Sequence, residues 1–345
     1  MLVALLAVEG ILLLSGRWFP KGYAVLIAIA SVGVFLFLML VWFVLTLNFH
    51  WRFQFSLRSL LVLTVAVAIP CSWLAVELKW ASEQREVVEA IQELSMRGGW
   101  VRYDYEDSPN QTPSGPPWLR RLIGDDFFVN VSEVSLDETS ITDAGLEHLN
   151  LKALAGLHYL SLYATQVTDA GLEHIKALTE LQFLYFHDTH VTDAGLEHLK
   201  GLTQLKELML IYTPVTNAGL EHLKGLTQLQ LLVLNSTQIT DAGLEHLKGL
   251  TQLQKLALCD TRVTNAGLEH LKGLTQLQSL ILDETQVTDE GLKHLKGLTR
   301  LRELWLNDTR VTDKGVKEIQ QALPNCDIRA GSTERRVPLL DYPTR

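Results

Sequence analysis

The sequence predicts an α/β solenoid of short repeats, preceded by an α-helical transmembrane region. The first observation is a Thr-Asp/Asn-x-Gly motif with a first step of 26 residues and six further steps of 24. The motif begins at Thr142, Thr168, Thr192, Thr216, Thr240, Thr264, Thr288 and Thr312. The second observation is that long uncharged runs are confined to the first 80 of 345 residues. Domain boundaries are therefore expected near residues 80 and 130.

Each repeat is expected to contain a strand, a turn, a short helix and a return loop, as in residues 229–253. Leu232 and Leu234 alternate with Leu231 and Val233, so a strand here can bury one face. A single repeat cannot bury its own leucines. Stacking is therefore expected to place the strands side by side over a continuous core.

Three residues of this repeat have expected structural roles. Thr237 follows the strand, where its hydroxyl can satisfy backbone groups in a buried bend. Asp241 is placed to cap the helix N-terminus. Gly249 is expected to end the helix as its C′ residue.

The pattern LxxLxLxxTxxTDxGLxxL, over about residues 131–330, resembles the leucine-rich-repeat family in its ribonuclease-inhibitor-like form. It is most similar to the subtype with cysteine at the turn. Threonine takes that place here, at Thr139, Thr165, Thr189, Thr213, Thr237, Thr261, Thr285 and Thr309. The resemblance implies a right-handed horseshoe of about eight repeats, with a concave parallel sheet and outer helices. It commonly implies protein recognition.

The N-terminal residues 1–80 are expected to form the membrane region. Residues 23–47 and 60–76 are uncharged runs of 25 and 17 residues, long enough or nearly so for a helix to cross a bilayer. Residues 2–14 are either a third span or a segment on the membrane surface. Hydrophobic spans followed by repeats resemble bacterial membrane-anchored members of the family, which generally lack an assigned activity.

Basic residues near these runs predict the orientation. One side of the membrane receives Arg17, Lys21, Lys79 and Arg85, and the other receives Arg52 and Arg58. The positive-inside rule therefore places the repeats on the cytoplasmic side, and the bilayer is an expected partner of the N-terminal spans.

The solenoid is expected to be closed at both ends. Residues 81–130 are assigned to a linker and N-terminal cap, with a helix at 81–96 and a strand at 100–105, because an open first repeat needs its edge covered. Residues 331–345 are expected to be a disordered tail.

The outward strand positions vary while the framework is copied. In repeats two to five they form one aromatic and apolar patch if the strands stack. The candidate contact residues are Tyr159, Tyr163, Phe183, Tyr185, His187, Met209, Ile211, Tyr212, Leu231 and Val233. Exposed patches of this composition usually mark partner contacts. Two alternatives are drift at unconstrained positions, and a cap or tail that covers the patch.

Other chemistries receive little support. A net charge of -9 without a basic cluster after the membrane region argues against nucleic acid. The three cysteines do not form a disulfide framework or a metal pair. One histidine per repeat forms a ladder that lacks ligands in metal-like spacing, so a copied residue on the helix face is the simpler explanation. No catalytic motif is found and no cofactor is expected.

Two functions follow from the sequence. The first is a non-catalytic, membrane-anchored module that binds a partner protein through its concave face. The alternative is a rigid spacer or a self-assembling scaffold at the membrane, which implies a homo-oligomer.

The predicted orientation can be tested with a reporter fused after Arg345. A reporter that works only in the cytoplasm is expected to be active, because four basic residues outnumber two. Activity restricted to an extracytoplasmic reporter at the same position contradicts the charge argument.

Overall fold

The computed structural model describes residues 57–94, 98–106, 112–154 and 156–331. The chain divides into two units, Met1–Glu89 with Arg102–Val131 and Ala90–Val101 with Ser132–Arg345. The predicted segments 2–14 and 23–47, and the predicted tail beyond Gly331, lie outside the described residues.

The segment 60–76 lies in helix α3 (Leu57–Leu94), which also contains the predicted helix of the cap. Within the part of the chain that the structure describes, none of the helices combines the length and the apolar composition of a membrane crossing. The transmembrane region therefore stays a prediction.

The first unit has a small core of its own. Leu119 of α4 (Pro117–Ile123), together with Phe127 and Phe128, is buried against side chains of α3. The 3₁₀ turn η2 (Asp125–Phe127) supplies the first of these two phenylalanines. Their rings meet edge to face, with centroids 5.1 Å apart.

Gln84 fastens α3 to the end of the same unit. Its Nε2 donates to the Val129 carbonyl at 3.1 Å, and its Oε1 accepts from the Val131 amide at 3.3 Å. A buried amide side chain whose two ends are both bonded avoids the cost of unsatisfied polar groups. The linker helix is therefore held by a specific contact.

The second unit contains a sheet in which strand order follows sequence order, from β1 to β10. Each strand from β2 to β9 pairs in parallel with the next, as predicted. The strands are β1 (Trp100–Tyr103), β2 (Val131–Ser135), β3 (Tyr159–Ser161), β4 (Phe183–Tyr185), β5 (Glu207–Met209), β6 (Leu231–Val233), β7 (Lys255–Ala257), β8 (Ser279–Ile281), β9 (Glu303–Trp305) and β10 (Asp327–Arg329).

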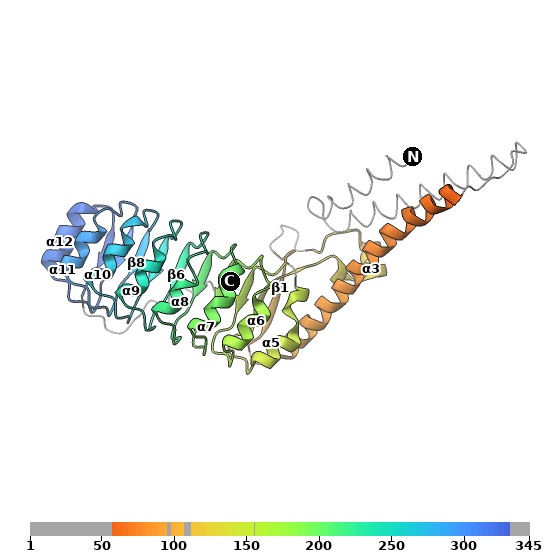
Figure 1. The fold of residues 1–345 in the computed structure, drawn as a ribbon, viewed down its shortest axis with the longest axis horizontal. Coiled ribbons are helices and arrows are strands. Elements are labelled where there is room, and N and C mark those ends of the chain that lie inside the picture. Colours follow the sequence, from red (N-terminus) through yellow and green to blue (C-terminus); the bar gives the residue numbers. More distant parts are fainter. Residues whose placement is uncertain (1–56, 95–97, 107–111, 155, 332–345) are drawn as a thin grey trace, which may run out of the picture. The chain divides into compact units, whose positions relative to one another are not determined.

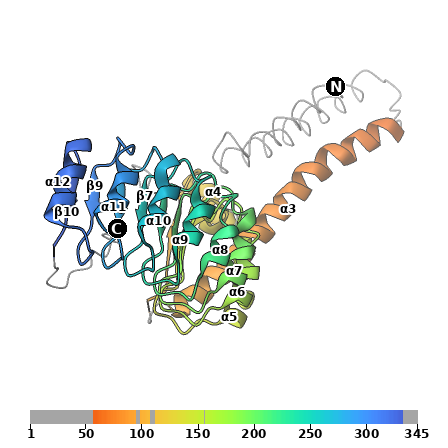
Figure 2. The ribbon, with the colours of Figure 1, turned by 60° about the vertical axis from the view of Figure 1, so that its left-hand side comes forward.

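Figures 1 and 2 show the helices of this unit following one another along one side of the sheet. They are α5 (Asp143–Leu149), α6 (Asp169–Ile175), α7 (Asp193–Leu196), α8 (Asn217–Glu221), α9 (Asp241–Leu244), α10 (Asn265–Leu268), α11 (Asp289–Leu292) and α12 (Asp313–Ala322). Five 3₁₀ turns extend them: η3 (Leu151–Ala153), η4 (Glu197–Gly201), η5 (Glu245–Leu247), η6 (Glu269–Gly273) and η7 (Lys293–Leu295). The predicted unit of strand, turn, short helix and return loop is confirmed.

The leucines of the repeat form the core between sheet and helices. The central residue of each short strand, such as Leu208 or Leu232, pairs in register with its counterpart on the next strand. Leu208 and Leu232 have no exposed surface, and neither do the helix residues Leu220 and Leu244. Burying a leucine side chain contributes about 1.5–3 kcal/mol, so the core grows with each repeat.

The threonine after each strand satisfies the bend, as predicted. Its hydroxyl donates to the carbonyl three residues earlier at 2.6–3.2 Å. Thr237, for example, donates to Leu234 and is buried. The threonine hydroxyl thus gives the carbonyl of the bend a hydrogen-bond donor, a role that a backbone amide has in a regular turn.

The aspartate after the motif threonine does not cap its own helix, contrary to the prediction. The threonine is the N-cap residue; Thr216, for example, accepts a bond from Ala218 N. The Asp193 carboxylate instead reaches the next repeat, where Oδ1 accepts from Thr216 N at 2.7 Å and Oδ2 from Thr216 Oγ1 at 2.5 Å. The sequence placed this acidic group at a helix start, but it could not show which repeat the side chain faces.

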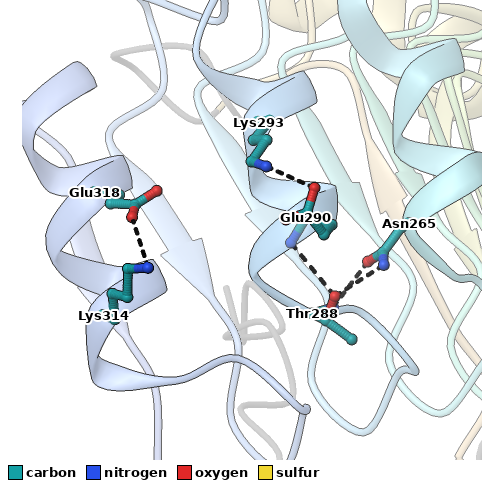
Figure 3. A network of polar contacts seen from close by, with 6 residues as sticks. All are labelled: Asn265, Thr288, Glu290, Lys293, Lys314 and Glu318. Carbon is teal, nitrogen blue, oxygen red and sulfur yellow. Dashed lines mark hydrogen bonds and ion pairs between the residues drawn. The ribbon is translucent and has the colours of Figure 1, made fainter.

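Asparagine replaces the aspartate in two repeats without breaking the link. Asn265 Oδ1 accepts from Thr288 N at 2.8 Å, while its Nδ2 donates to Thr288 Oγ1 at 2.9 Å. Figure 3 shows Asn265 and Glu290 converging on Thr288 from the two repeats. The threonine hydroxyl therefore accepts from asparagine where it donates to aspartate.

The motif glycine leaves room for this link. A Cβ atom added at Gly219 would lie 2.5 Å from Asp193 Oδ1 and 3.0 Å from a methyl carbon of Leu196. Any side chain here would push the carboxylate away from Thr216. The motif Thr-Asp/Asn-x-Gly thus encodes one contact between successive repeats, which we call the inter-repeat link.

Gly249 is not the left-handed C′ residue that was predicted. It does not have a positive φ, and helix α9 passes directly into the 3₁₀ turn η5. A glycine that precedes a buried leucine in a return loop gives the same sequence signal as a helix terminator.

Replacing Asp193 tests the inter-repeat link. Asp193→Ala is expected to lower the free energy of unfolding by about 1–3 kcal/mol, since two donors of Thr216 lose their acceptor. Asp193→Asn is expected to change it by less than about 1 kcal/mol, because asparagine already serves in two repeats. Urea unfolding measures both, and equal stability of the two variants contradicts the assignment.

Candidate protein-binding surface

The predicted contact residues stand on the side of the sheet that faces away from the helices, which we call the outer sheet face. Strand register places those that belong to strands in two columns. One column runs Tyr159, Phe183, Glu207, Leu231, Lys255, Ser279 and Glu303, and a second runs Ser161, Tyr185, Met209, Val233, Ala257, Ile281 and Trp305. The expected neighbourhood of aromatic and apolar side chains on adjacent strands is present.

Much of this face is less accessible than the sequence suggested. Eight residues form a buried set that we call the outer cluster: Tyr185, Met209, Ile211, Leu231, Val233, Ala257, Cys259 and Ile281. His187 is also buried, while Tyr159, Tyr163 and Phe183 are partly buried. The expectation of an exposed patch is therefore wrong for six of the ten candidates. Alternation assigns a side chain to a face, but its accessibility depends on neighbours that the sequence does not reveal.

Aromatic rings gather where the face begins. The Tyr159 ring meets Tyr185 edge to face at 5.2 Å between centroids and stacks on Trp100 at 5.9 Å. Phe183 lies 6.4 Å from the same tyrosine. Such pairs contribute about 0.5–1.5 kcal/mol each beyond their buried area. Tyr159 is therefore fixed among rings, and it is still only partly buried.

A second row of rings follows the strand ends. The Tyr163 and His187 rings are 4.6 Å apart, and His187 stacks on Tyr212 at 5.7 Å. Tyr212 keeps 58% of its surface exposed, which makes it the most accessible of the ten candidates. Its backbone is left-handed, with a φ of 52°. The equivalent turn position is left-handed in the other repeats as well, for example at Asp188 and Ser236, so this conformation belongs to the repeat and places whichever side chain stands there.

Tyr212 borders a shallow groove of about 560 Å³ along the turns after β3 to β6. Polar side chains that also line it include Gln166, Asp188, His190 and Gln238. An exposed aromatic ring beside hydrogen-bonding groups is the composition that protein interfaces favour. The groove was not predicted, because its residues lie in the turns after the strands, whereas the sequence analysis compared outward positions of the strands.

The outer sheet face changes character along the solenoid. Lys255, Asp260 and Glu303 are exposed. Arg329 covers the Trp305 ring, with its guanidinium carbon 4.4 Å from the centroid. The face thus runs from aromatic at β3–β4 to charged at β7–β10, so its two ends differ in chemistry.

Two side chains just after the strands accept hydrogen bonds from backbone amides of the next repeat. Asn235 Oδ1 accepts from Cys259 N at 2.9 Å, and Asp283 Oδ1 accepts from Asn307 N at 2.7 Å. Burial raises the pKa of Asp283, while the two bonds from Asn307 oppose that change. The sequence analysis missed these bridges. The signal that could have predicted them is an Asn or Asp two residues after a strand.

Two titratable groups of the face are affected by burial. Burial raises the pKa of the Cys259 thiol to about 12, so the thiol is protonated and a poor nucleophile. Burial lowers the pKa of His187, and the charges of Asp188 and Asp137 partly oppose this. His187 is therefore held in its neutral form inside the row of rings.

The helix side shows a plainer pattern. Glutamate and lysine pair at i and i+3, for example Glu221 with Lys224 at 3.3 Å, on side chains that are half exposed or more. Such pairs contribute little to stability. Among the described residues, no group of three or more His, Cys, Asp or Glu side chains is arranged to hold a metal ion.

Comparison with known proteins adds one solved structure. No protein-family model matches the chain, and no curated protein matches it. The chain is similar to internalin C2 from Listeria monocytogenes, with 28% identity, over 58% of this chain and 80% of that one, and with a TM-score of 0.48. The solenoid fold assigned above rests on the repeats and on the parallel sheet themselves.

The pH dependence of stability tests the state of His187. An unfolded chain binds a proton at this histidine near pH 6.5, but the folded chain resists it, so stability declines as pH falls below about 6.5. In the variant His187→Gln the decline in the free energy of unfolding between about pH 7.5 and 5 is expected to be smaller.

The matched control is His190→Gln, since His190 is exposed in the next turn position. It shows how much of any change is due to the substitution of histidine by glutamine rather than to burial at position 187. A His187→Gln variant whose stability falls as steeply as that of the original chain contradicts the burial argument.

Proposed function

We propose that this chain is a membrane-anchored module that binds a partner protein through its outer sheet face. A leucine-rich-repeat fold in general suggests protein–protein interaction, and the repeats and sheet of this chain are consistent with that fold. The single observation that carries the proposal is the exposed ring of Tyr212, which lies beside a row of rings and a groove.

The partner surface is expected to be mixed rather than purely apolar. Tyr159, Phe183 and Tyr212 offer accessible aromatic area at one end, where contact hot spots usually form. Exposed Lys255, Glu303 and their neighbours offer charge at the other end, which favours correct orientation and fast association. The buried candidates, such as Val233, belong to the outer cluster, against which Tyr159 and Phe183 pack on the same face.

The ribonuclease-inhibitor-like form and the membrane anchor belong to the same proposal. The copied pattern with threonine in the cysteine position supports the first. The uncharged residues 23–47 and 60–76 support the second, and the four-to-two division of basic residues supports a cytoplasmic position of the repeats.

The alternative is a structural spacer or scaffold that associates with itself. Near-identical repeats and the regular Glu–Lys pairs of the helix side favour it. We do not propose catalysis, since the most concentrated variable surface is aromatic and apolar and the Cys259 thiol is protonated.

Photo-crosslinking tests the binding surface. A photo-reactive residue is placed at Tyr212 in the full chain in its native membrane, with a control at Lys224, which is exposed on the helix side. A distinct protein trapped only from position 212 is the expected result.

The trapped protein is then purified and its affinity measured. Phe183→Ala is expected to weaken binding about tenfold, or about 1.4 kcal/mol, since it removes an accessible ring. Lys224→Ala should leave the affinity unchanged. Adducts between copies of this chain alone refute the partner and favour the scaffold.

A further inference from the structure

Exposed apolar side chains gather in the first unit. Among the described residues, seven large hydrophobic side chains are exposed, and five of them belong to α3 or α4: Val76, Leu78, Trp80, Trp118 and Leu122. Leu122 keeps 75% of its surface exposed, the largest fraction of the seven. Single exposed apolar residues are common, but a concentration of them in one small unit usually marks a contact surface.

Helix α4 is apolar on two neighbouring sides. Leu119 and Ile123 are four residues apart and share one side, which packs in the small core of the unit. Trp118 and Leu122 are also four residues apart and share the next side, and both are exposed. The core of the unit accounts for the first side only.

Helix α4 lies near the end of the uncharged run 60–76. The core to which it contributes contacts Trp73 and Leu74, which are among the last four residues of the run, and Ala81, which is five residues beyond it. These contacts cover about 12 Å along α3. The headgroup region on each side of a bilayer is roughly 5–8 Å thick. A bilayer surface at the end of the run would therefore have α4 at headgroup level.

The surface of α3 changes from apolar to charged over the same length. Val76 and Trp80 are exposed, whereas the exposed residues of the next turns include Arg85, Glu86 and Glu89. Tryptophan is enriched at the boundary between a membrane and water. Trp80 therefore has the position along α3 at which an interfacial ring is expected.

The two arginines of α4 differ in their partners. Arg120 is held by the protein itself, with Nη1 3.5 Å from Asp125 Oδ1. Arg121 is exposed and forms no ion pair within the part of the chain that the structure describes. An arginine can lay its stem along apolar surface while its guanidinium binds a phosphate, so Arg121 suits a lipid headgroup.

A bilayer fits this surface better than a partner protein does. A stable protein interface buries about 800 Å² on each partner, whereas the exposed apolar side of α4 consists of two side chains on a helix of seven residues. Interfacial helices, by contrast, combine tryptophan and leucine on one side with basic residues on the other. The run 60–76, which the proposed function assigns to the anchor, brings this surface to the bilayer.

We propose that α4 lies in the bilayer interface, with Trp118 and Leu122 at the boundary between headgroups and acyl chains and Arg121 at the lipid phosphates. The helix is then a second attachment point, which holds the first unit against the membrane surface. This inference rests on the membrane anchor of the proposed function. Insertion of apolar side chains drives the contact, so it is expected on neutral phosphatidylcholine as well as on anionic lipid.

A photo-reactive residue at Leu122 tests the contact. The full chain is reconstituted into phosphatidylcholine vesicles and irradiated, and the adducts are identified by mass spectrometry. The matched control carries the same residue at Glu86, which is exposed on the charged part of α3. Position 122 is expected to give about tenfold more phospholipid adduct than position 86.

A second variant checks the role of the exposed side of α4. Trp118→Asp, in the chain with the reporter at position 122, is expected to lower the yield of phospholipid adduct by about half or more, because a charge resists transfer into the interface. Trp118→Phe is the conservative control and should keep the yield. Because Trp118 is exposed, neither change disturbs the core.

Two outcomes overturn the interfacial helix. Equal yields of phospholipid adduct at positions 122 and 86 show that the exposed side of α4 is not inserted. Adducts at position 122 that join two copies of this chain, in place of lipid, assign this side of the helix to an interface between copies.

Extraction of the same vesicles with alkaline carbonate separates this inference from the proposed anchor. A chain that stays with the vesicles but gives no phospholipid adduct at position 122 keeps the anchor and loses the interfacial helix. A chain that gives the adduct but is released by carbonate keeps the interfacial helix and loses the anchor. Trapping of a partner from Tyr212 is scored separately and tests the binding function alone.

Discussion

The link between successive repeats is the contact on which this structure depends. A carboxylate or amide of one repeat binds the amide and hydroxyl of the next threonine, as Asp193 binds Thr216. The glycine after it, Gly219, must lack a side chain for the two to meet. The link holds the start of each helix at a fixed distance from the start of the next. Strands of only three residues therefore stay in register, and the central leucine of one strand lies beside that of the next.

Because the inter-repeat link and the core fix the repeat, the residue types on the outer sheet face are free to vary from repeat to repeat. The core leucines, the turn threonine and the linking Asp or Asn are all committed to structure, but positions such as Tyr159, Lys255 and Trp305 are not. Variation there creates an aromatic end and a charged end on one regular surface. The binding role we propose follows from this separation of structural and variable positions.

The repeat period predicted the sheet, its strand order and its parallel register. Repeats of equal length that stack in sequence order bring equivalent strand residues side by side. It also predicted which side chains share the outer face. It misassigned Asp241 as a cap of its own helix, since a contact 23 residues away leaves the same local pattern. Burial of Tyr185 and Met209 was missed because alternation carries no information on what lies above a sheet.

Hydrogen exchange at the motif threonine amides tests the inter-repeat link most directly. The amides of Thr192, Thr216 and Thr264 donate to carboxylates at 2.7 Å rather than to the backbone. If the link holds the solenoid together, these amides exchange only with unfolding of the repeats, as slowly as those of core strand residues. Exchange as fast as that of exposed loop amides would show that the link is open in solution and contradict the account.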